Sequence, residues 1–234
     1  MPEELTMRVI ARIRSDFSTK FGIPRQSGLV QDLKAAVVFE PEYRSPDALR
    51  GLEEYTHIWL IWQFSQAVRE DGSWTATVRP PRLGGNVRMG VFATRSPFRP
   101  NAIGLSSVRL DGVEPETPEG PVLHVSGADL LDGTPILDIK PYLPFTDAHP
   151  EAADGFASRS VVRPLEVHAD PRLLEQLPPE RRAALLGVLR QDPRPAYQND
   201  PERVYGLEFA GFDVKFTVDS GILTVCGLAP LAVR

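Results

Sequence analysis

The chain has 234 residues, 42% of them hydrophobic and 24% charged, a composition typical of a soluble globular protein with one large domain or a large and a small one. No apolar run approaches the roughly 20 residues of a membrane span, and the first residues lack the apolar region of a signal peptide, so we expect a cytoplasmic protein. The net charge of −5 argues against non-specific coating of nucleic acid, and the single cysteine excludes an internal disulfide and a CxxC metal site.

The first 141 residues predict a β-rich unit of about eight short strands with little helix between them. Residues 7–14 alternate between apolar and polar side chains, and residues 56–64 form a continuous apolar and aromatic run typical of a buried strand. A short helix is expected at 45–55, with Ser45 as its N-cap. The other expected strands are residues 35–40, 74–80, 87–94, 104–110, 121–127 and 135–140. This pattern favours an antiparallel sheet or closed barrel over a doubly wound parallel fold, so the fold class is mainly β.

A change of composition after residue 141, toward Pro, Ala and Asp without periodicity, indicates a domain boundary. The expected divisions are a β-barrel domain at 1–150, a linker at 151–160 and a small α+β domain at 161–234.

The expected second domain begins with two helices and ends with a hairpin. Asp170 is the N-cap candidate of the first helix, and Leu185, Val188 and Leu189 share one face of the second. Strict alternation at 212–218, followed by a DSG turn and the strand-like run at 222–228, predicts a hairpin. Its second strand is apolar around Cys226, so this cysteine is expected to be buried.

Arginine is concentrated in one segment of this acidic chain. Between Arg79 and Leu110 there are six arginines and no acidic residue. The planar guanidinium suits carboxylate and phosphate and stacks on bases, although pairing with acids elsewhere in the fold is an equally good explanation.

Four loops dense in Gly and Pro join the apolar strands, at 22–28, 79–85, 90–110 and 129–142. Each taken alone reads as an ordinary turn, but binding residues concentrate on such loops. Their chemistry is complementary: arginines for a carboxylate or phosphate, amides for base edges, aspartates for a hydroxyl or ammonium, and small residues for close backbone approach. The residues concerned are Arg25, Arg95, Gln26, Gln66, Asn101, Asp132, Asp138, Gly133 and Pro135. An amino-acid-bearing nucleoside such as S-adenosylmethionine would satisfy all of them, without being singled out.

Signatures of several other enzyme classes are missing. The sequence has no GxGxxG, no GxxxxGK[ST], no HExxH and no GxSxG, and its four histidines have no metal-ligand spacing. Metal catalysis is therefore not expected.

Long blocks of the sequence resemble the TrmO (YaeB-like) family of tRNA methyltransferases. They are "VRPPRLGGNVRMGVFATRSPFRPNAIGLSSVRL", "DLLDGTPILDIKPYLPFTD", "FGIPRQSGL", "LRGLEEYTHIWLIWQF" and "QDPRPAY". The resemblance spans nearly the whole chain. It implies a single-sheet antiparallel β-barrel, a homodimer, and methyl transfer from S-adenosylmethionine to the exocyclic N6 of threonylcarbamoyladenosine beside the anticodon of threonine tRNA.

The resemblance also implies which residues touch the cofactor. These are Pro24, Arg25, Gln26, Ser65, Gln66, Arg95, Leu105, Asp132, Gly133, Thr134 and Pro135. Relatives can carry His where this chain has Ser65, so a side-chain base at that position cannot be general to the mechanism.

For the catalytic and tRNA-binding roles, the sequence offers more than one candidate residue. Asp138 is the first candidate for the proton acceptor and Asp132 the second, although either could be a turn or core residue. Lys140 or Arg99 could hold the threonyl carboxylate of the substrate. The candidate tRNA contacts are Arg79, Arg82, Arg88, Arg99, Asn101, Lys140, Arg194 and Tyr197. A non-catalytic RNA-binding module and a regulator that binds an adenosine-type ligand are the alternative functions.

Overall fold

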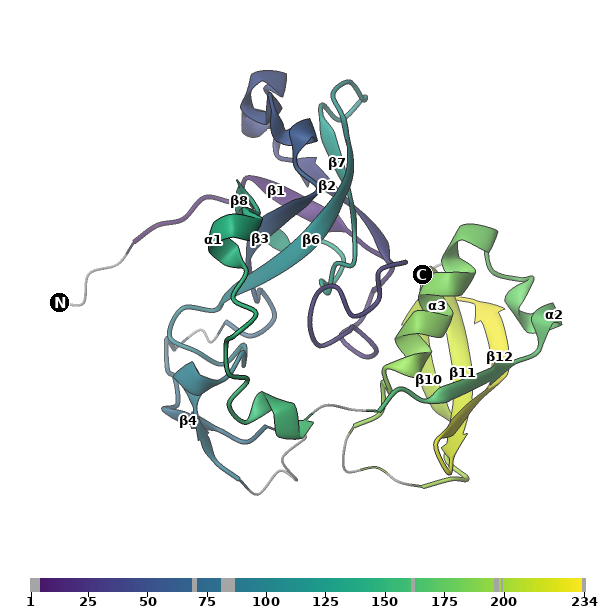
Figure 1. Cartoon of the computed structure of the whole chain (residues 1–234). Coiled ribbons are helices and arrows are strands. Elements are labelled where there is room, and N and C mark those ends of the chain that lie inside the picture. The colour runs from purple at the N-terminus through teal and green to yellow at the C-terminus, as the bar shows by residue number, and fades with distance from the viewer. Residues whose placement is uncertain are drawn as a thin grey trace.

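Six strands close into an antiparallel β-barrel in this computed structural model, which describes residues 5–68, 71–80, 87–160, 163–195, 198 and 200–232. The strands follow one another around the barrel in the order β1, β2, β7, β6, β3 and β8 (Figure 1). Their bounds are β1 Ala11–Arg14, β2 Lys34–Phe39, β3 His57–Gln63, β6 Ile103–Glu114, β7 Val122–Ser126 and β8 Pro135–Pro141. Every pairing in the barrel is antiparallel, which confirms the predicted fold class.

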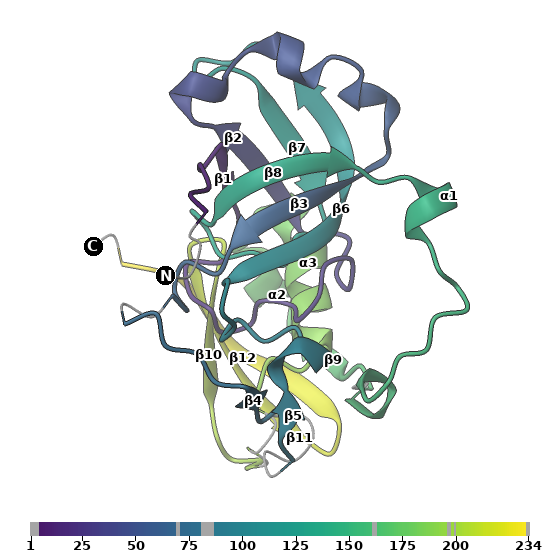
Figure 2. The same ribbon diagram turned by 90° about the vertical axis from the view of Figure 1, so that its left-hand side faces the viewer.

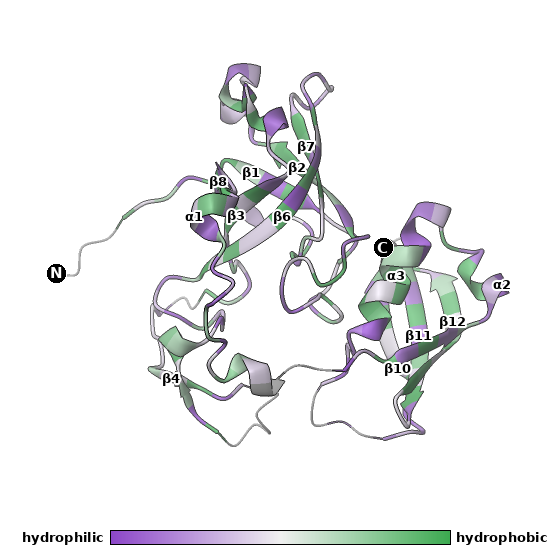
Figure 3. Cartoon of the chain, viewed as in Figure 1, coloured by the Kyte–Doolittle hydropathy of each residue, from purple (hydrophilic) through white to green (hydrophobic). Residues whose placement is uncertain are grey.

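Alternation of side chains along the strands produces the barrel core. Ile58 and Leu60 of β3 are fully buried, whereas the intervening Trp59 is only partly so. Hydrophobic and hydrophilic residues accordingly alternate along the strands (Figure 3). Because strand side chains point to opposite faces in turn, one face of each strand fills the barrel and the other stays available to loops or ligands.

Two predicted elements between the barrel strands were wrong in detail. The expected helix at 45–55 is two short 3-10 segments, η2 Pro46–Leu49 and η3 Leu52–Glu54, and Ser45 makes no side-chain cap; a further segment, η1 Pro41–Tyr43, precedes them. Gly51, with φ of 86°, separates η2 from η3, since a left-handed residue ends a helical run. The two expected strands at 74–80 and 87–94 shrink to a two-residue pair outside the barrel, β4 Thr77–Val78 with β5 Met89–Gly90, followed by η5 Val91–Ala93.

The second sheet lies beside the barrel (Figure 2) and has the strand order β10, β11, β12 and β9. Its bounds are β9 Glu166–Ala169, β10 Tyr205–Phe209, β11 Phe212–Asp219 and β12 Ile222–Pro230, and it follows α1 Pro144–Asp147 and η6 Ala157–Ser160. The predicted hairpin is the antiparallel pair of β11 and β12. Cys226, however, is exposed rather than buried, because it shares the outward face of β12 with Thr224.

Two helices accompany this sheet, α2 Pro171–Leu174 and α3 Pro179–Arg190. The Asp170 carboxylate accepts a hydrogen bond from the Arg172 backbone N–H at 2.9 Å, which confirms it as the N-cap. The predicted face of α3 is buried as expected. None of the helices in the described part of the chain is long and apolar enough to cross a membrane.

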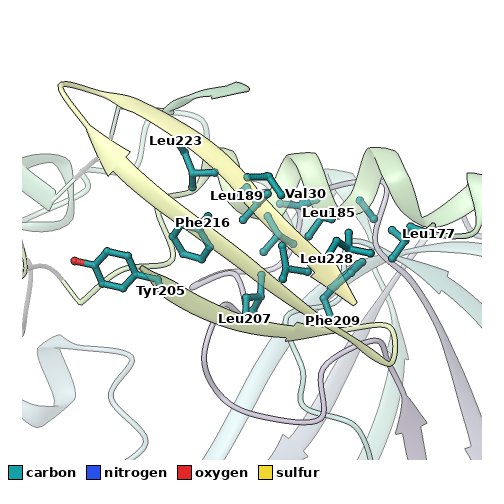
Figure 4. Close-up of a cluster of buried hydrophobic side chains, with 14 of the residues drawn as sticks. Val30, Leu177, Leu185, Leu189, Tyr205, Leu207, Phe209, Phe216, Leu223 and Leu228 are labelled. Carbon is teal, nitrogen blue, oxygen red and sulfur yellow. The ribbon is translucent and has the colours of Figure 1, made fainter. Parts of the chain in front are cut away.

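The connection between β1 and β2, residues 15–33, joins the two units. Phe17 and Val30 of this connection are buried in the core of the second unit, where Phe17 packs edge-on against Phe209 at 5.6 Å between ring centroids. Figure 4 shows Val30 among the leucines of α3 and the sheet, with Leu185 beside it. The second unit therefore supports a segment of the barrel that carries the Pro24-Arg25-Gln26 motif.

Candidate functional site

A cavity of about 790 Å³ lies where the connection 15–33, the end of β3, the turn after η5 and the start of β6 meet. Its volume is within the range of small-molecule and cofactor sites, about 300–1,000 Å³. The predicted cofactor residues that line it are Pro24, Arg25, Gln26, Ser65, Gln66, Arg95, Leu105 and Thr134. Three of the four loops singled out in the sequence, 22–28, 90–110 and 129–142, thus meet the end of β3 at one cavity.

Contacts across the cavity tie the loops together. The Arg95 guanidinium donates a hydrogen bond to Oε1 of Gln26, from the turn after η5 to the connection 15–33. Lys20 Nζ donates to the backbone carbonyl of Gln66 at 3.3 Å. A ligand that enters between these loops therefore meets side chains that are already positioned, which lowers the entropy cost of binding.

The arginine-rich turn at 94–99 uses its two arginines differently. Arg95 faces the cavity, whereas Arg99 folds back and donates to the carbonyls of Thr94 at 3.0 Å and Ser96 at 3.2 Å. Arg99 also lines the cavity, but part of its hydrogen-bonding capacity holds the turn in shape. The two arginines of this turn therefore have different roles. Arg95 donates a hydrogen bond across the cavity, and Arg99 donates to backbone carbonyls that have no strand partner.

A hydrogen-bonded chain of buried side chains forms one wall of the cavity. Trp62 Nε1 donates to Ser106 Oγ at 3.0 Å, and Ser106 Oγ donates to Asp129 Oδ1 at 2.6 Å. Gly104 makes room for the indole, because a Cβ there would lie 2.3 Å from a Trp62 ring atom. Burial raises the pKa of the Asp129 carboxyl above its ordinary value, while the Ser106 hydrogen bond and the charge of Arg95 oppose that shift.

The second unit approaches the cavity through Asp192, which follows α3. Partial burial lowers the pKa of Arg25, and the Asp192 carboxylate acts in the opposite direction. Asp192 also holds Arg194 in a two-pronged ion pair of 2.9 and 3.0 Å. Only 11% of the Arg194 side chain is exposed, and the guanidinium of this predicted tRNA contact is taken up by its ion pair with Asp192.

The two aspartates expected to be catalytic do not line this cavity. Asp132 is exposed and accepts a hydrogen bond from the Ser15 backbone N–H at 3.0 Å, and its neighbours Gly133 and Pro135 are also outside the lining. Asp138 pairs with Lys140 at 2.9 Å on β8. Lys140 is the cross-strand neighbour of Trp59, which does line the cavity, so this pair lies beside the site rather than in it.

The expected tRNA contacts on the β4–β5 segment lie away from the cavity lining. Arg79 and Arg88 are exposed, beside the exposed pair of Trp74 and Phe92, whose ring centroids are 5.9 Å apart. Asn101 lines a smaller adjoining cavity of about 340 Å³. Arg82 and Tyr197 fall outside the described residues.

Asp129, Trp59 and Trp62 also line the cavity, although the sequence patterns did not single them out as candidate site residues. Asp129 stands in the same DLLDGTP block as Asp132, but only the direction of the chain within the loop decides which carboxylate turns inward. Of the carboxylates among the described residues, Asp129 alone lines the cavity.

The family model for the tRNA-methyltransferase O N-terminal domain matches residues 12–148, and the model for the TrmO C-terminal domain matches residues 163–231. The chain belongs to the TrmO family. The tRNA (adenine(37)-N6)-methyltransferase of Escherichia coli K12 is 41% identical over 229 residues, 94% of this chain and 96% of its own.

A second relative and a solved structure, both from Pseudomonas aeruginosa, are similar over most of the chain. The putative S-adenosylmethionine-dependent methyltransferase RcsF of Pseudomonas aeruginosa PAO1 is 43% identical over 215 residues, 88% of this chain and 89% of its own. A crystal structure of TrmO from Pseudomonas aeruginosa superposes with a TM-score of 0.80 and 34% identity, and covers 98% of this chain and 99% of its own.

Proposed function

We propose that this protein transfers a methyl group from S-adenosylmethionine to the exocyclic N6 of adenine 37 in tRNA, as the names of its relatives describe for them. The acceptor is threonylcarbamoyladenosine in threonine tRNA. The enzyme acts in the cytoplasm as a homodimer.

The lining of the cavity fits this cofactor in charge and shape. Lys20, Arg25 and Arg95 offer cations to the carboxylate of the amino-acid moiety. Trp59, Trp62 and Phe64 provide aromatic surface suited to a purine, since stacking on such side chains is sequence-tolerant and favourable. The volume of about 790 Å³ leaves room for a nucleoside-sized ligand and part of an acceptor base.

The rim of the cavity fits an approaching RNA. Leu105 is 54% exposed and Ile103 39% exposed, on either side of the buried Gly104. Exposed apolar side chains gathered at a cavity mouth mark a binding surface. An acceptor base turned out of the RNA could cover them, as enzymes that modify bases require.

Positioning supplies much of the catalysis in this proposal. The cofactor supplies an activated methyl group, and its transfer is an in-line displacement. The loops of this chain hold the acceptor nitrogen close to the methyl carbon and exclude water.

The hydrogen bond between Arg95 and Gln26 is the observation that carries the proposal, because it brings two separate motifs of the cofactor site to one cavity. The test is mass spectrometry of tRNA nucleosides after incubation with S-adenosylmethionine and tRNA from a strain that lacks the activity. Wild-type protein should convert threonylcarbamoyladenosine to its methylated form in threonine tRNA. Arg95→Ala should lose about 100-fold or more of this activity.

Arg172→Ala is the matched control, since Arg172 is an exposed arginine of α2 in the second unit. It should retain full activity. Absence of methylation by the wild type, despite binding of tRNA, would favour the non-catalytic RNA-binding alternative. Binding of the cofactor without binding of tRNA would favour the regulator.

A further inference from the structure

We propose that Asp129 is the proton acceptor of the methyl-transfer reaction, at the end of the chain Trp62–Ser106–Asp129 in the cavity wall. This inference rests on the proposed function. It replaces Asp138 and Asp132, which do not line the cavity, with a carboxylate that does.

The first argument is the inventory of the cavity. Its described lining contains no histidine, cysteine, tyrosine or glutamate and only one aspartate. The remaining polar side chains are arginine, lysine, glutamine, serine, threonine and tryptophan, none of which readily takes a proton at neutral pH. Asp129 is therefore the lining group with the chemistry to serve as a base.

The second argument is the way the carboxylate is held. Ser106 is 1% exposed, and its hydroxyl accepts a hydrogen bond from Trp62 Nε1 and donates one to Asp129 Oδ1, since an ionised carboxylate can only accept. This direction of donation fixes one carboxylate oxygen from the barrel side. The Ser27 backbone N–H and the Arg95 charge act on it from the loops. A base held in this way needs little reorganisation when the acceptor arrives.

The third argument is charge balance. The acceptor N–H bond breaks and its proton passes to a carboxylate oxygen of Asp129, while the nitrogen forms a bond to the methyl carbon. The carbon–sulfur bond breaks with its electron pair left on sulfur. A sulfonium and a carboxylate thus become a neutral sulfide and a neutral carboxylic acid, and the proton leaves to solvent afterwards. Removing two opposite charges together is favourable in a poorly solvated cavity.

The charged groups around Asp129 set the pH at which it works. Arg95 faces it from the turn after η5, and Lys20, Arg25 and Arg99 line the same cavity. All four are cations that favour the ionised carboxylate, while burial opposes ionisation. The carboxyl group is consequently ionised and poised to accept a proton only above its raised pKa.

The test uses Asp129→Asn, which keeps the shape and removes the base. We expect kcat to fall by about 100-fold or more, and the dissociation constant of S-adenosylmethionine, read from quenching of tryptophan fluorescence, to stay within about threefold. A variant with unchanged kcat would overturn the proposal. So would normal kcat at saturating cofactor with a dissociation constant raised by about tenfold, since Asp129 would then bind the cationic end of the cofactor.

Ser106→Ala provides a second test that also works on the ligand-free protein. Loss of the hydroxyl donor should raise the pKa of Asp129, visible in a ¹³C NMR titration of the aspartate carboxyl groups, assigned by through-bond correlation of each carboxyl carbon to its own backbone. The acidic limb of the kcat/KM–pH profile, which reports the free enzyme, should move to higher pH by the same amount. An acidic limb that does not follow the Asp129 titration would refute the assignment, even if Asp129→Asn failed to fold. Lack of methylation by the wild type would instead refute the proposed function.

Discussion

Replacing Gly104 with alanine tests whether the cavity wall depends on close packing between β6 and the indole of Trp62. The new Cβ would lie 2.3, 2.5 and 2.6 Å from three Trp62 ring atoms. Ordinary contact needs about 3.5 Å or more, so the ring must move by roughly 1 Å. The ring has little freedom to do so, because Trp62 is 8% exposed and packs on Phe64 at 4.2 Å between centroids.

The expected cost has two parts. Overpacking a well-filled core costs about 1–3 kcal/mol. Displacement of the indole also loses the hydrogen bond from Trp62 Nε1 to Ser106 Oγ, worth about 1 kcal/mol. The free energy of unfolding should therefore fall by about 2–4 kcal/mol, which for a chain of this size lowers Tm by roughly 4–16 °C.

The assay is urea denaturation followed by tryptophan fluorescence, with affinity for S-adenosylmethionine measured in parallel. Gly112→Ala is the matched control on the same strand, since a Cβ there meets nothing within 4 Å. It should change stability by less than about 0.5 kcal/mol. Equal unfolding midpoints for the two variants would refute the reasoning about the wall.

Three other changes test different parts of the structure. Phe17→Ala should lower the free energy of unfolding by about 3–5 kcal/mol. It should also weaken cofactor binding, because Phe17 anchors the connection 15–33 in the core of the second unit. Asp111→Asn should lower the free energy of unfolding by about 1–2 kcal/mol at pH 7. Burial alone would raise the pKa of Asp111, but hydrogen bonds from Lys34 and Ser126 outweigh it and hold that pKa below its ordinary value. This stabilisation is present above the unfolded-state pKa of about 4 and is lost as pH falls through the lower folded-state value, so the difference from wild type should vanish in acid. In Arg99→Ala the turn at 94–99 loses two hydrogen bonds to its carbonyls. The free energy of cofactor binding should therefore weaken by more kcal/mol than the free energy of unfolding falls.

Each of these changes has a control in the same chain. Phe145→Ala removes a phenylalanine that is 83% exposed and should leave Tm unchanged. Asp47→Asn breaks a largely exposed pair with Arg50 and should leave the free energy of unfolding at pH 7 nearly unchanged. Arg172→Ala should bind cofactor normally. If Phe17→Ala lowered stability yet bound the cofactor with wild-type affinity, the support of the site by the second unit would be contradicted.

Local patterns in the sequence were enough to predict the six barrel strands and the hairpin of the second unit. Alternation at 212–218 and the apolar run at 56–64 report burial directly, because a strand's side chains point to opposite faces with period two. The same rule, followed in register, places Cys226 on the outward face of β12, which a reading of the apolar run as wholly buried overlooked.

The candidate site was only partly predictable. Pro24, Gln26 and Arg95 were found because their motifs are distinctive, and the structure brings them together at one cavity. Whether Asp129 or Asp132 turns inward depends on the path of a loop of a few residues, which no periodicity constrains. The fold-back of Arg99 onto its own turn likewise depends on carbonyls that the strand pairing leaves unpaired.

The sequence by itself determined a β-rich chain with loops of cationic, amide and acidic residues, because strand periodicity and turn chemistry are local properties. Only the tertiary structure decided which of these side chains share a cavity and that the connection 15–33 is buried in the second core. The physical reason is that closing six strands into a barrel fixes the positions of residues far apart in sequence, such as Trp62, Ser106 and Asp129.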